Sequence, residues 1–100
     1  MNLGKAIKTT RTARGLTQQE LAQRANLSVS YLSLLEKNKR DPSLSSIESI
    51  ALALNIPLSI MMFLAADRSE LDMIDKGFVE KMSYAIYELV HANQEQQTLL

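Results

Sequence analysis

One stretch of the chain, residues 17–40, constrains the fold most, because it carries the start signals of two short helices separated by a turn. Thr17, with Glu20 three residues later, forms a capping-box pattern, which satisfies the free amides at a helix start. Asn26 tolerates the left-handed backbone conformation that ends a helix and redirects the chain. Ser28 is a favourable N-cap for the next helix. The stretch therefore predicts two helices joined by a tight turn.

The second of these helices has an inward side and an outward side. Leu32 and Leu35 are spaced so that both face the first helix. The outward side carries Val29, Ser30, Ser33 and Leu34. A polar and basic segment, KNKRDPS at residues 37–43, follows directly, and its proline prevents helix through Asp41. The outward side and the segment after it are therefore the candidate functional surface.

These residues resemble the helix-turn-helix of the Xre/Cro family of phage and bacterial repressors. The resemblance is carried by Gln18 through Ala22, Asn26, Leu32, Leu35, Glu36 and the segment RDPSLSSIESIALALNIPLSIM. It covers roughly residues 3–66, and it departs from the family at Asn26, where the family usually has glycine. The resemblance implies an all-α fold, in which a five-helix lambda-repressor-like domain precedes a C-terminal amphipathic helix.

The resemblance also implies roles for individual side chains. In the family the second helix of the motif enters the major groove of double-stranded DNA with its N-terminus first. The matching base-reading positions are Ser28, Val29, Ser30, Ser33 and Leu34, with Tyr31 beside them. The candidates for phosphate contacts are Gln18, Arg14, Lys37, Asn38, Lys39 and Arg40. Arg11 and Glu36 match a structural ion pair that joins the first helix to the third.

The charges of the chain are distributed unevenly, although the formal net charge is zero. Residues 1–40 hold eight basic and two acidic side chains, so this part carries +6. Residues 41–100 hold three basic and nine acidic side chains, so this part carries −6. This asymmetry favours a basic DNA-facing surface, with an acidic segment held away from it, over a chance division of surface charge.

Three further helices are expected in the same domain. The first covers residues 3–14, has Ile7 on its inner side and stops at Gly15. The fourth covers residues 43–54, and its apolar stripe consists of Leu44, Ile47, Ile50, Ala51 and Leu54. The fifth begins at Pro57 and is apolar almost all round, so part of it should meet another surface. Packing within its own chain, beneath the C-terminal helix, is the alternative.

An amphipathic helix is expected after this domain, from its cap Ser69 to about Ala92, with a kink or a break at Gly77. We therefore divide the chain into a DNA-binding domain at residues 1–66 and a helical segment at residues 67–100. The helix needs an apolar partner, and a second copy of the chain is the first choice. Folding back on its own domain and binding another protein are the alternatives. The residues expected at the dimer interface are Met62, Phe63, Ile74, Phe78, Met82, Ile86 and Leu89.

The sequence offers little support for enzymatic or metal chemistry. His91 is the only histidine, and its place near the end of an acidic helix is typical of a surface residue. There is no cysteine, no glycine-rich phosphate loop and no metal-ligand spacing. Four carboxylates near the start of the last helix are better explained as surface charge favoured by the helix dipole, namely Asp67, Glu70, Asp72 and Asp75. We expect no catalytic residue, metal or cofactor.

The apolar content of 46% suffices for a core, but no apolar run approaches the roughly 20 residues that cross a bilayer. The N-terminal sequence MNLGKAIKTT lacks the apolar stretch of a secretory signal, so we expect a cytoplasmic protein without membrane contact. The predicted function is a transcriptional regulator, a repressor or controller, that binds an inverted-repeat operator as a homodimer. The alternative is an antitoxin-type or anti-repressor module whose C-terminal helix binds a protein partner.

Overall fold

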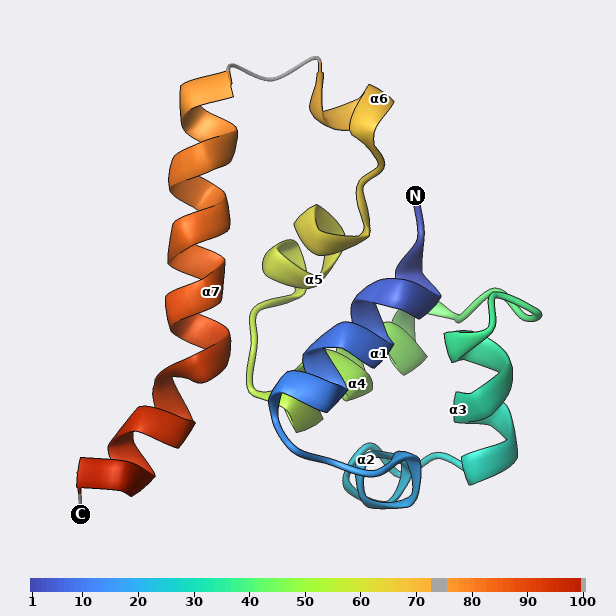
Figure 1. Cartoon of the computed structure of the whole chain (residues 1–100). Coiled ribbons are helices and arrows are strands. Elements are labelled where there is room, and N and C mark those ends of the chain that lie inside the picture. The colour runs from blue at the N-terminus through green and yellow to red at the C-terminus, as the bar shows by residue number, and fades with distance from the viewer. Residues whose placement is uncertain (73–75, 100) are drawn as a thin grey trace.

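The structure, a computed structural model, describes residues 1–72 and 76–99, with side chains described for residues 1–67, 69–72 and 76–91. Every element in this described part is a helix: α1 (Leu3–Ala13), α2 (Gln18–Arg24), α3 (Val29–Glu36), α4 (Leu44–Leu54), α5 (Leu58–Ala65), α6 (Arg68–Leu71) and α7 (Lys76–Leu99). Helices α1 to α5 pack around one core, and α7 runs beside them (Figure 1). The prediction of an all-α fold with a five-helix domain and a C-terminal helix is confirmed.

The helices of the central stretch begin where their N-caps predict. The Thr17 hydroxyl accepts a hydrogen bond from the Glu20 amide, and the Glu20 carboxylate accepts one from the Thr17 amide, both at 3.0 Å. The bond from the Thr17 amide to the carboxylate is the first reason that the pKa of Glu20 lies below its ordinary value. The Ser28 hydroxyl accepts from the Tyr31 amide at 3.1 Å, and α3 starts at Val29. The side-chain hydrogen bonds of Thr17 and Ser28 therefore determine where α2 and α3 begin.

Three asparagines in the left-handed conformation end helices α2, α3 and α4. Asn26, Asn38 and Asn55 have φ values of 58°, 56° and 57°. In each case the next residue donates its amide back to the helix: Leu27 to the Ala22 carbonyl at 2.8 Å, Lys39 to Leu34 at 3.0 Å and Ile56 to Ala51 at 3.0 Å. The last carbonyls of these helices are thereby satisfied. The turn role predicted for Asn26 and the stop predicted at Asn55 are both present.

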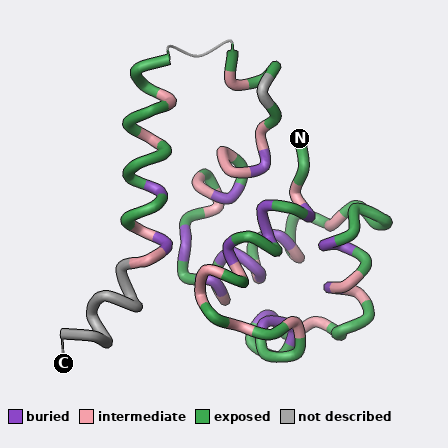
Figure 2. The backbone as a smooth tube through the Cα atoms, viewed as in Figure 1, coloured by how far each residue is buried: buried purple, intermediate pink, exposed green. Residues whose placement is uncertain are grey.

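The core is aliphatic, and each helix from α1 to α5 contributes to it. Its largest fully buried apolar side chains are Ile7, Leu21, Leu32, Leu35, Ile50, Leu54 and Met61. Figure 2 shows the buried positions on the sides of these helices that face one another. One expectation is wrong, since Leu44 is 68% exposed. It is the first residue of α4 and therefore projects beyond the core.

The segment after α5 differs from the sequence prediction at its cap. Asp67, rather than Ser69, caps α6: its carboxylate accepts from the Glu70 amide at 2.9 Å, while the Glu70 carboxylate accepts from the Asp67 amide at 3.0 Å. The Ser69 hydroxyl donates to Asp67 at 2.7 Å, and this bond is the first reason that the pKa of Asp67 lies below its usual range. Helix α6 ends at Leu71, and α7 contains Gly77 in its first turn.

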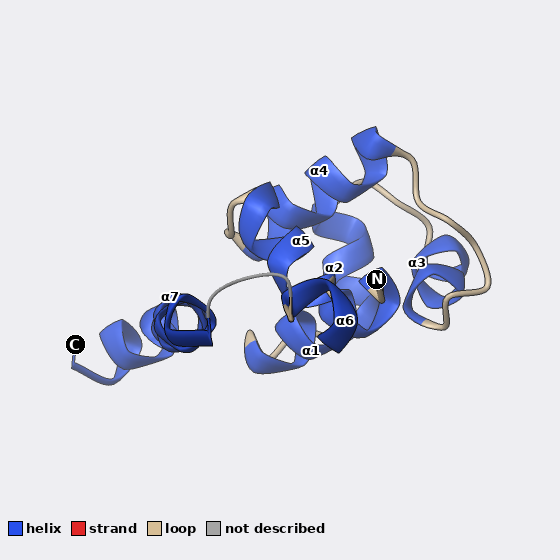
Figure 3. Cartoon of the chain, turned by 90° about the horizontal axis from the view of Figure 1, so that it is seen from above, coloured by secondary structure: helices blue, strands red, loops and turns tan. Residues whose placement is uncertain are grey.

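Helix α7 folds back onto the domain, so one of the two alternatives to self-association is realised. Ile86 is only 4% exposed and lies with Val90 against α1 and α5. Figure 3, which looks down on the molecule, shows α7 beside the five-helix body. The prediction of Ile86 as a dimer contact is therefore wrong, because its own chain covers it. Leu89 is partly buried against the same core, and Ile74 lies outside the described residues.

No single helix within the described ranges is long and apolar enough to cross a membrane; only α4 and α5 taken together, as a pair bent by 104°, reach that length and composition.

Gly4 of α1 lies directly against the end of α3. A Cβ atom at this position would lie 2.5 Å from the Leu35 carbonyl oxygen and 2.7 Å from both the Glu36 carbonyl oxygen and Asn38 Oδ1. Two of these atoms belong to the backbone of α3, so only movement of the whole helix could relieve the clash. The absence of a side chain at Gly4 is therefore what brings α1 and α3 together.

We predict that Gly4→Ala lowers the free energy of unfolding by about 3 kcal/mol, because α1 and α3 must separate to admit the methyl group. Urea denaturation followed by circular dichroism measures the loss. Gly15→Ala is the matched control: its φ is +72° with nothing within 4 Å of the Cβ position, so only backbone strain is added. This strain should cost about 1 kcal/mol. Equal losses in the two variants would contradict the close contact at Gly4.

Candidate nucleic-acid interface

The outer side of α3 presents a row of short side chains at the edge of the molecule. Ser28, Val29, Ser30 and Leu34 are exposed, and Ser33 is half-buried. Leu32 and Leu35, on the inner side, are fully buried. In both Figure 1 and Figure 3, α3 lies at the edge opposite α7. The positions predicted to read bases therefore share one accessible surface, which α7 leaves uncovered.

A single carboxylate joins the last residue of α3 to α1 and α2. Arg11 donates to both oxygens of Glu36, from Nε to Oε2 at 2.8 Å and from Nη2 to Oε1 at 3.1 Å. Gln18 Nε2 donates to Oε1 at 3.0 Å, and Arg11 Nη1 donates to the Leu16 carbonyl at 2.7 Å. The Glu36 side chain is 2% exposed. The ion pair that the family resemblance implies is therefore a bidentate, desolvated contact, and Gln18 belongs to it.

The basic segment after α3 holds three exposed cations beside the outer face. Lys37, Lys39 and Arg40 are all exposed. The Arg40 guanidinium carbon lies 5.5 Å from the centre of the Tyr31 ring, a cation–π distance. The Tyr31 hydroxyl in turn donates to Ser46 Oγ at 3.2 Å. Tyr31 thus positions Arg40 near α3, a role that the sequence spacing did not reveal.

Arg14, predicted to contact phosphate, caps α4 instead. Its Nε donates to the Leu54 carbonyl at 3.0 Å and its Nη2 to the Asn55 carbonyl at 3.3 Å. These carbonyls lie at the C-terminal end of α4, where the helix dipole favours a cation. Burial lowers the pKa of Arg14 from its ordinary value. The prediction for Arg14 is corrected, because its guanidinium serves the helix end.

Asn38, also predicted to contact phosphate, has both ends of its side-chain amide bonded within the protein. Its Oδ1 accepts from the Gly4 amide at 3.0 Å, and its Nδ2 donates to Asn2 Oδ1 at 2.7 Å. Its left-handed backbone also ends α3. Asn38 therefore joins the end of α3 to the start of α1, and the phosphate contact predicted for it stays a prediction.

The comparison with known proteins agrees with this geometry. Residues 7–61 match the family model described as Helix-turn-helix, which is more than half of the chain. This chain belongs to the helix-turn-helix family. The matched residues include the whole of α2 and α3 and lie within the stretch that resembles the Xre/Cro family, so the resemblance is confirmed.

Two kinds of relative support the membership of this helix-turn-helix protein. It is 49% identical over 59 residues to an immunity repressor protein of Bacillus phage phi105, which covers 59% of this chain but only 41% of the phage protein. The crystal structure of the clp gene regulator ClgR from C. glutamicum superposes with a TM-score of 0.62 at 31% identity, covering 64% of this chain and 83% of that one. The chain thus spans less than two thirds of the phage relative's length.

A third similarity extends over the C-terminal helix. A SinR protein/SinI protein complex matches 97% of this helix-turn-helix chain and 90% of that chain, with a TM-score of 0.59 at 26% identity.

The remaining residues predicted at the dimer interface differ in exposure. Phe78 is 50% exposed and Met62 is exposed, whereas Phe63 and Met82 are half-buried. Among the described side chains, no group of three or more histidines and carboxylates could hold a metal ion.

We predict that Glu36→Gln lowers the free energy of unfolding of this helix-turn-helix protein by about 3 kcal/mol, because the substitution leaves the Arg11 charge largely buried without its partner. Urea denaturation measures the change. The double variant Arg11→Met with Glu36→Leu should recover most of the loss, since it removes both charges. Glu48→Gln, an exposed position on α4, is the control and should change stability by less than about 0.5 kcal/mol. Additive losses in the double variant would contradict the pairing.

Proposed function

We propose that this chain is a sequence-specific DNA-binding transcriptional regulator, a repressor or controller, in which α3 enters the major groove. One observation carries the proposal: the exposed short side chains of α3 lie next to three exposed cations in the loop that follows. Such an arrangement suits base contacts within a groove and phosphate contacts at its border. The family membership and the repressor and regulator names of its relatives support the same conclusion.

The base-reading face offers hydroxyl and methyl groups. Ser30 and Ser33 hydroxyls donate to or accept from several bases, and Val29 packs against a thymine methyl group. Because Ser28 Oγ already accepts from the Tyr31 amide, its O–H is the group that reaches a base or phosphate. Leu34 borders this face. No arginine, asparagine or glutamine stands at these base-reading positions, so DNA shape supplies part of the specificity.

The phosphate contacts are proposed for Lys37, Lys39 and Arg40, which flank the groove entered by α3. Gln18 contributes from α2, because only one hydrogen of its side-chain amide is required by the bond to Glu36. The second hydrogen can donate to a phosphate oxygen. Asn38 stays a candidate on the same ground, since the bond to Asn2 uses only one hydrogen of its exposed side-chain amide. Arg14 is left out, because its Nε and Nη2 donate to the end of α4 and its Nη1 is buried.

We predict that Lys39→Ala weakens binding to all duplex sequences by a similar factor and reduces the slope of log K against log salt by about one. Ser30→Ala should instead change base preference at one position of each half-site and leave the slope unchanged. Fluorescence anisotropy with labelled duplexes at several salt concentrations measures both effects. Lys81→Ala, an exposed cation on α7, is the control and should have no effect. If neither Lys39→Ala nor Ser30→Ala alters binding while both remain folded, the assigned surface is wrong.

The regulator is proposed to act as a homodimer through α7 and α5. Phe78 and Met82 lie four residues apart in the first turns of α7, on the same side of the helix as Ile86 and Val90, and Leu89 lies at the edge of the contact with the domain. Met62 and Phe63 of α5 add apolar surface. A two-fold dimer of this kind pairs the same stripe from both copies and matches an inverted-repeat operator. In the proposed dimer, the first turns of α7 contact the partner copy, and the turns around Ile86 and Val90 contact its own domain.

We predict that Phe78→Ser weakens the dimer by about tenfold or more, since an aromatic residue at the centre of an apolar contact contributes strongly to association. Sedimentation equilibrium measures the dissociation constant. Tyr84→Ser, an exposed aromatic residue on another side of α7, is the matched control and should leave the dimer unchanged. Leu52 of α4 is 81% exposed and offers a competing apolar surface. Dissociation by Leu52→Ser, but not by Phe78→Ser, would place the interface on α4.

A second candidate function is the binding of a protein partner through α7. Tyr84 and Tyr87 are 69% and 60% exposed, and they lie on another side of α7 from Phe78, so they offer surface outside the proposed dimer contact. The SinR/SinI complex, which matches 97% of this chain, is an assembly of two different proteins. An equimolar partner that is lost from Tyr84→Ser, while the homodimer persists, would favour this function.

A further inference from the structure

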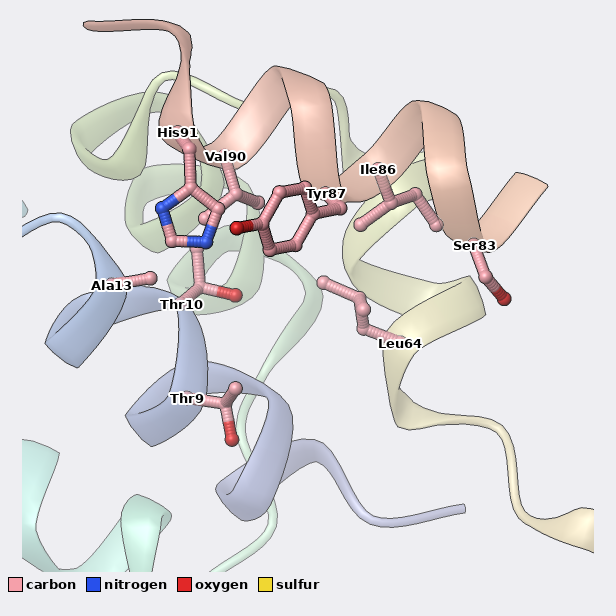
Figure 4. Close-up of a pocket in the computed structure, with 9 residues that line it drawn as sticks. All are labelled: Thr9, Thr10, Ala13, Leu64, Ser83, Ile86, Tyr87, Val90 and His91. Carbon is pink, nitrogen blue, oxygen red and sulfur yellow. The ribbon is translucent and has the colours of Figure 1, made fainter. Parts of the chain in front are cut away.

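A cavity of about 240 Å³, partly open to solvent, lies where α7 meets α1 and α5. Most of its wall is apolar and comes from Ala13, Leu64, Ile86, Tyr87 and Val90. Figure 4 shows α7 above the cavity, α1 below it and Leu64 of α5 at its side. The cavity therefore lies at the junction between the five-helix body and α7, away from the proposed DNA surface.

One polar group in this cavity has no hydrogen-bond partner. Thr10 of α1 is 1% exposed, and its Oγ1 makes no hydrogen bond within the protein. In Figure 4 its side chain rises from α1 into the space below Tyr87 and His91. A buried hydroxyl left unpaired destabilises a fold, and such groups are uncommon. The Thr10 hydroxyl is thus an unsatisfied donor beside an apolar space, and an acceptor from outside the chain would satisfy it.

We propose that this cavity binds a small, neutral, mainly apolar molecule that presents one carbonyl-type acceptor to Thr10. The size follows from comparison, since a cavity of about 150 Å³ holds benzene and stays dry. A volume of about 240 Å³ therefore accommodates roughly ten non-hydrogen atoms. A charged ligand is disfavoured because no lysine, arginine or carboxylate lines the cavity, and an uncompensated buried charge is costly.

The walls favour a ring in particular. The Tyr87 and His91 rings lie with their centroids 4.4 Å apart at an angle of 49°, and together they form one side of the cavity. Aromatic rings pack well against tilted aromatic edges of this kind. Water reaches the open side of the cavity, but the apolar walls offer it few hydrogen-bond partners. Ser83 at the border already donates its hydroxyl to the Val79 carbonyl at 2.8 Å.

A ligand in this position contacts the five-helix body and α7 at once, so its binding stabilises the docked position of α7. Thr10 also precedes Arg11, whose guanidinium holds Glu36 at the end of α3. A ligand of this kind would control how firmly α7 is docked on the five-helix body, which is a property separate from DNA binding. It stands or falls independently of any DNA measurement.

The test uses the full chain with methyl groups labelled with carbon-13, titrated with three probes. Acetophenone carries a ring and one carbonyl. Cumene has the same shape with a methyl group in place of the carbonyl oxygen, and benzoate adds a charge. We expect saturable shifts of the Leu64, Ile86 and Val90 methyl signals with both acetophenone and cumene. Benzoate should give no saturable shift.

Two variants make the test specific. Thr10→Val keeps the side-chain shape and removes the hydroxyl, so the affinity for acetophenone relative to that for cumene should fall roughly fivefold to tenfold while cumene still binds. Ala13→Leu fills the cavity and should abolish the binding of both probes. The proposal is overturned if neither probe gives saturable shifts in the wild-type chain, if the shifts map to other residues, or if Thr10→Val leaves the ratio of the two affinities unchanged.

Discussion

The position of α3 at the edge of the domain depends on one buried carboxylate, that of Glu36. Helix α3 has only eight residues, which is too short to be stable by itself in water. Glu36 at its end receives hydrogen bonds from Arg11 of α1 and Gln18 of α2, so one side chain connects three helices. Gly4 lets α1 approach the same helix end without a side chain between them. The outer face of α3 is therefore held by its inner contacts, and the residues on it are left available for a partner.

The sequence predicted the helix ends well, because these depend on neighbours in the chain. Thr17 and Glu20 are three residues apart, and the left-handed turn at Asn26 is a property of that residue itself. The sequence did not predict the long-range partners of polar side chains. Arg14 bonds to a carbonyl 40 positions away, and Asn38 bonds to an amide 34 positions away. A basic or amide side chain near a groove-entering helix has the same sequence signature whether it bonds to phosphate or to its own backbone.

The sequence of the C-terminal segment likewise did not identify the long-range contacts of α7. The apolar stripe of α7 correctly predicted that one side of the helix is covered, but a stripe does not say what covers it. Ile86 is covered by α1 and α5 of its own chain, whereas Phe78, two turns earlier, remains half exposed. Asp67 and Ser69 are both suitable caps, and Asp67 prevails because Glu70 stands three residues after it and completes the capping box. The cavity at Thr10 arises only from tertiary packing and has no sequence signal.

The central claim is that α3, held by Glu36, reads DNA sequence in a two-fold symmetric assembly. Selection of bound sequences from a random duplex pool with the full-length chain at moderate salt tests it most directly. The account predicts enrichment of an inverted repeat whose half-sites are separated by one helical turn or a whole multiple of it. A pool that remains random, with salt-sensitive general binding or none, would contradict the claim and would make protein binding through α7 the primary function.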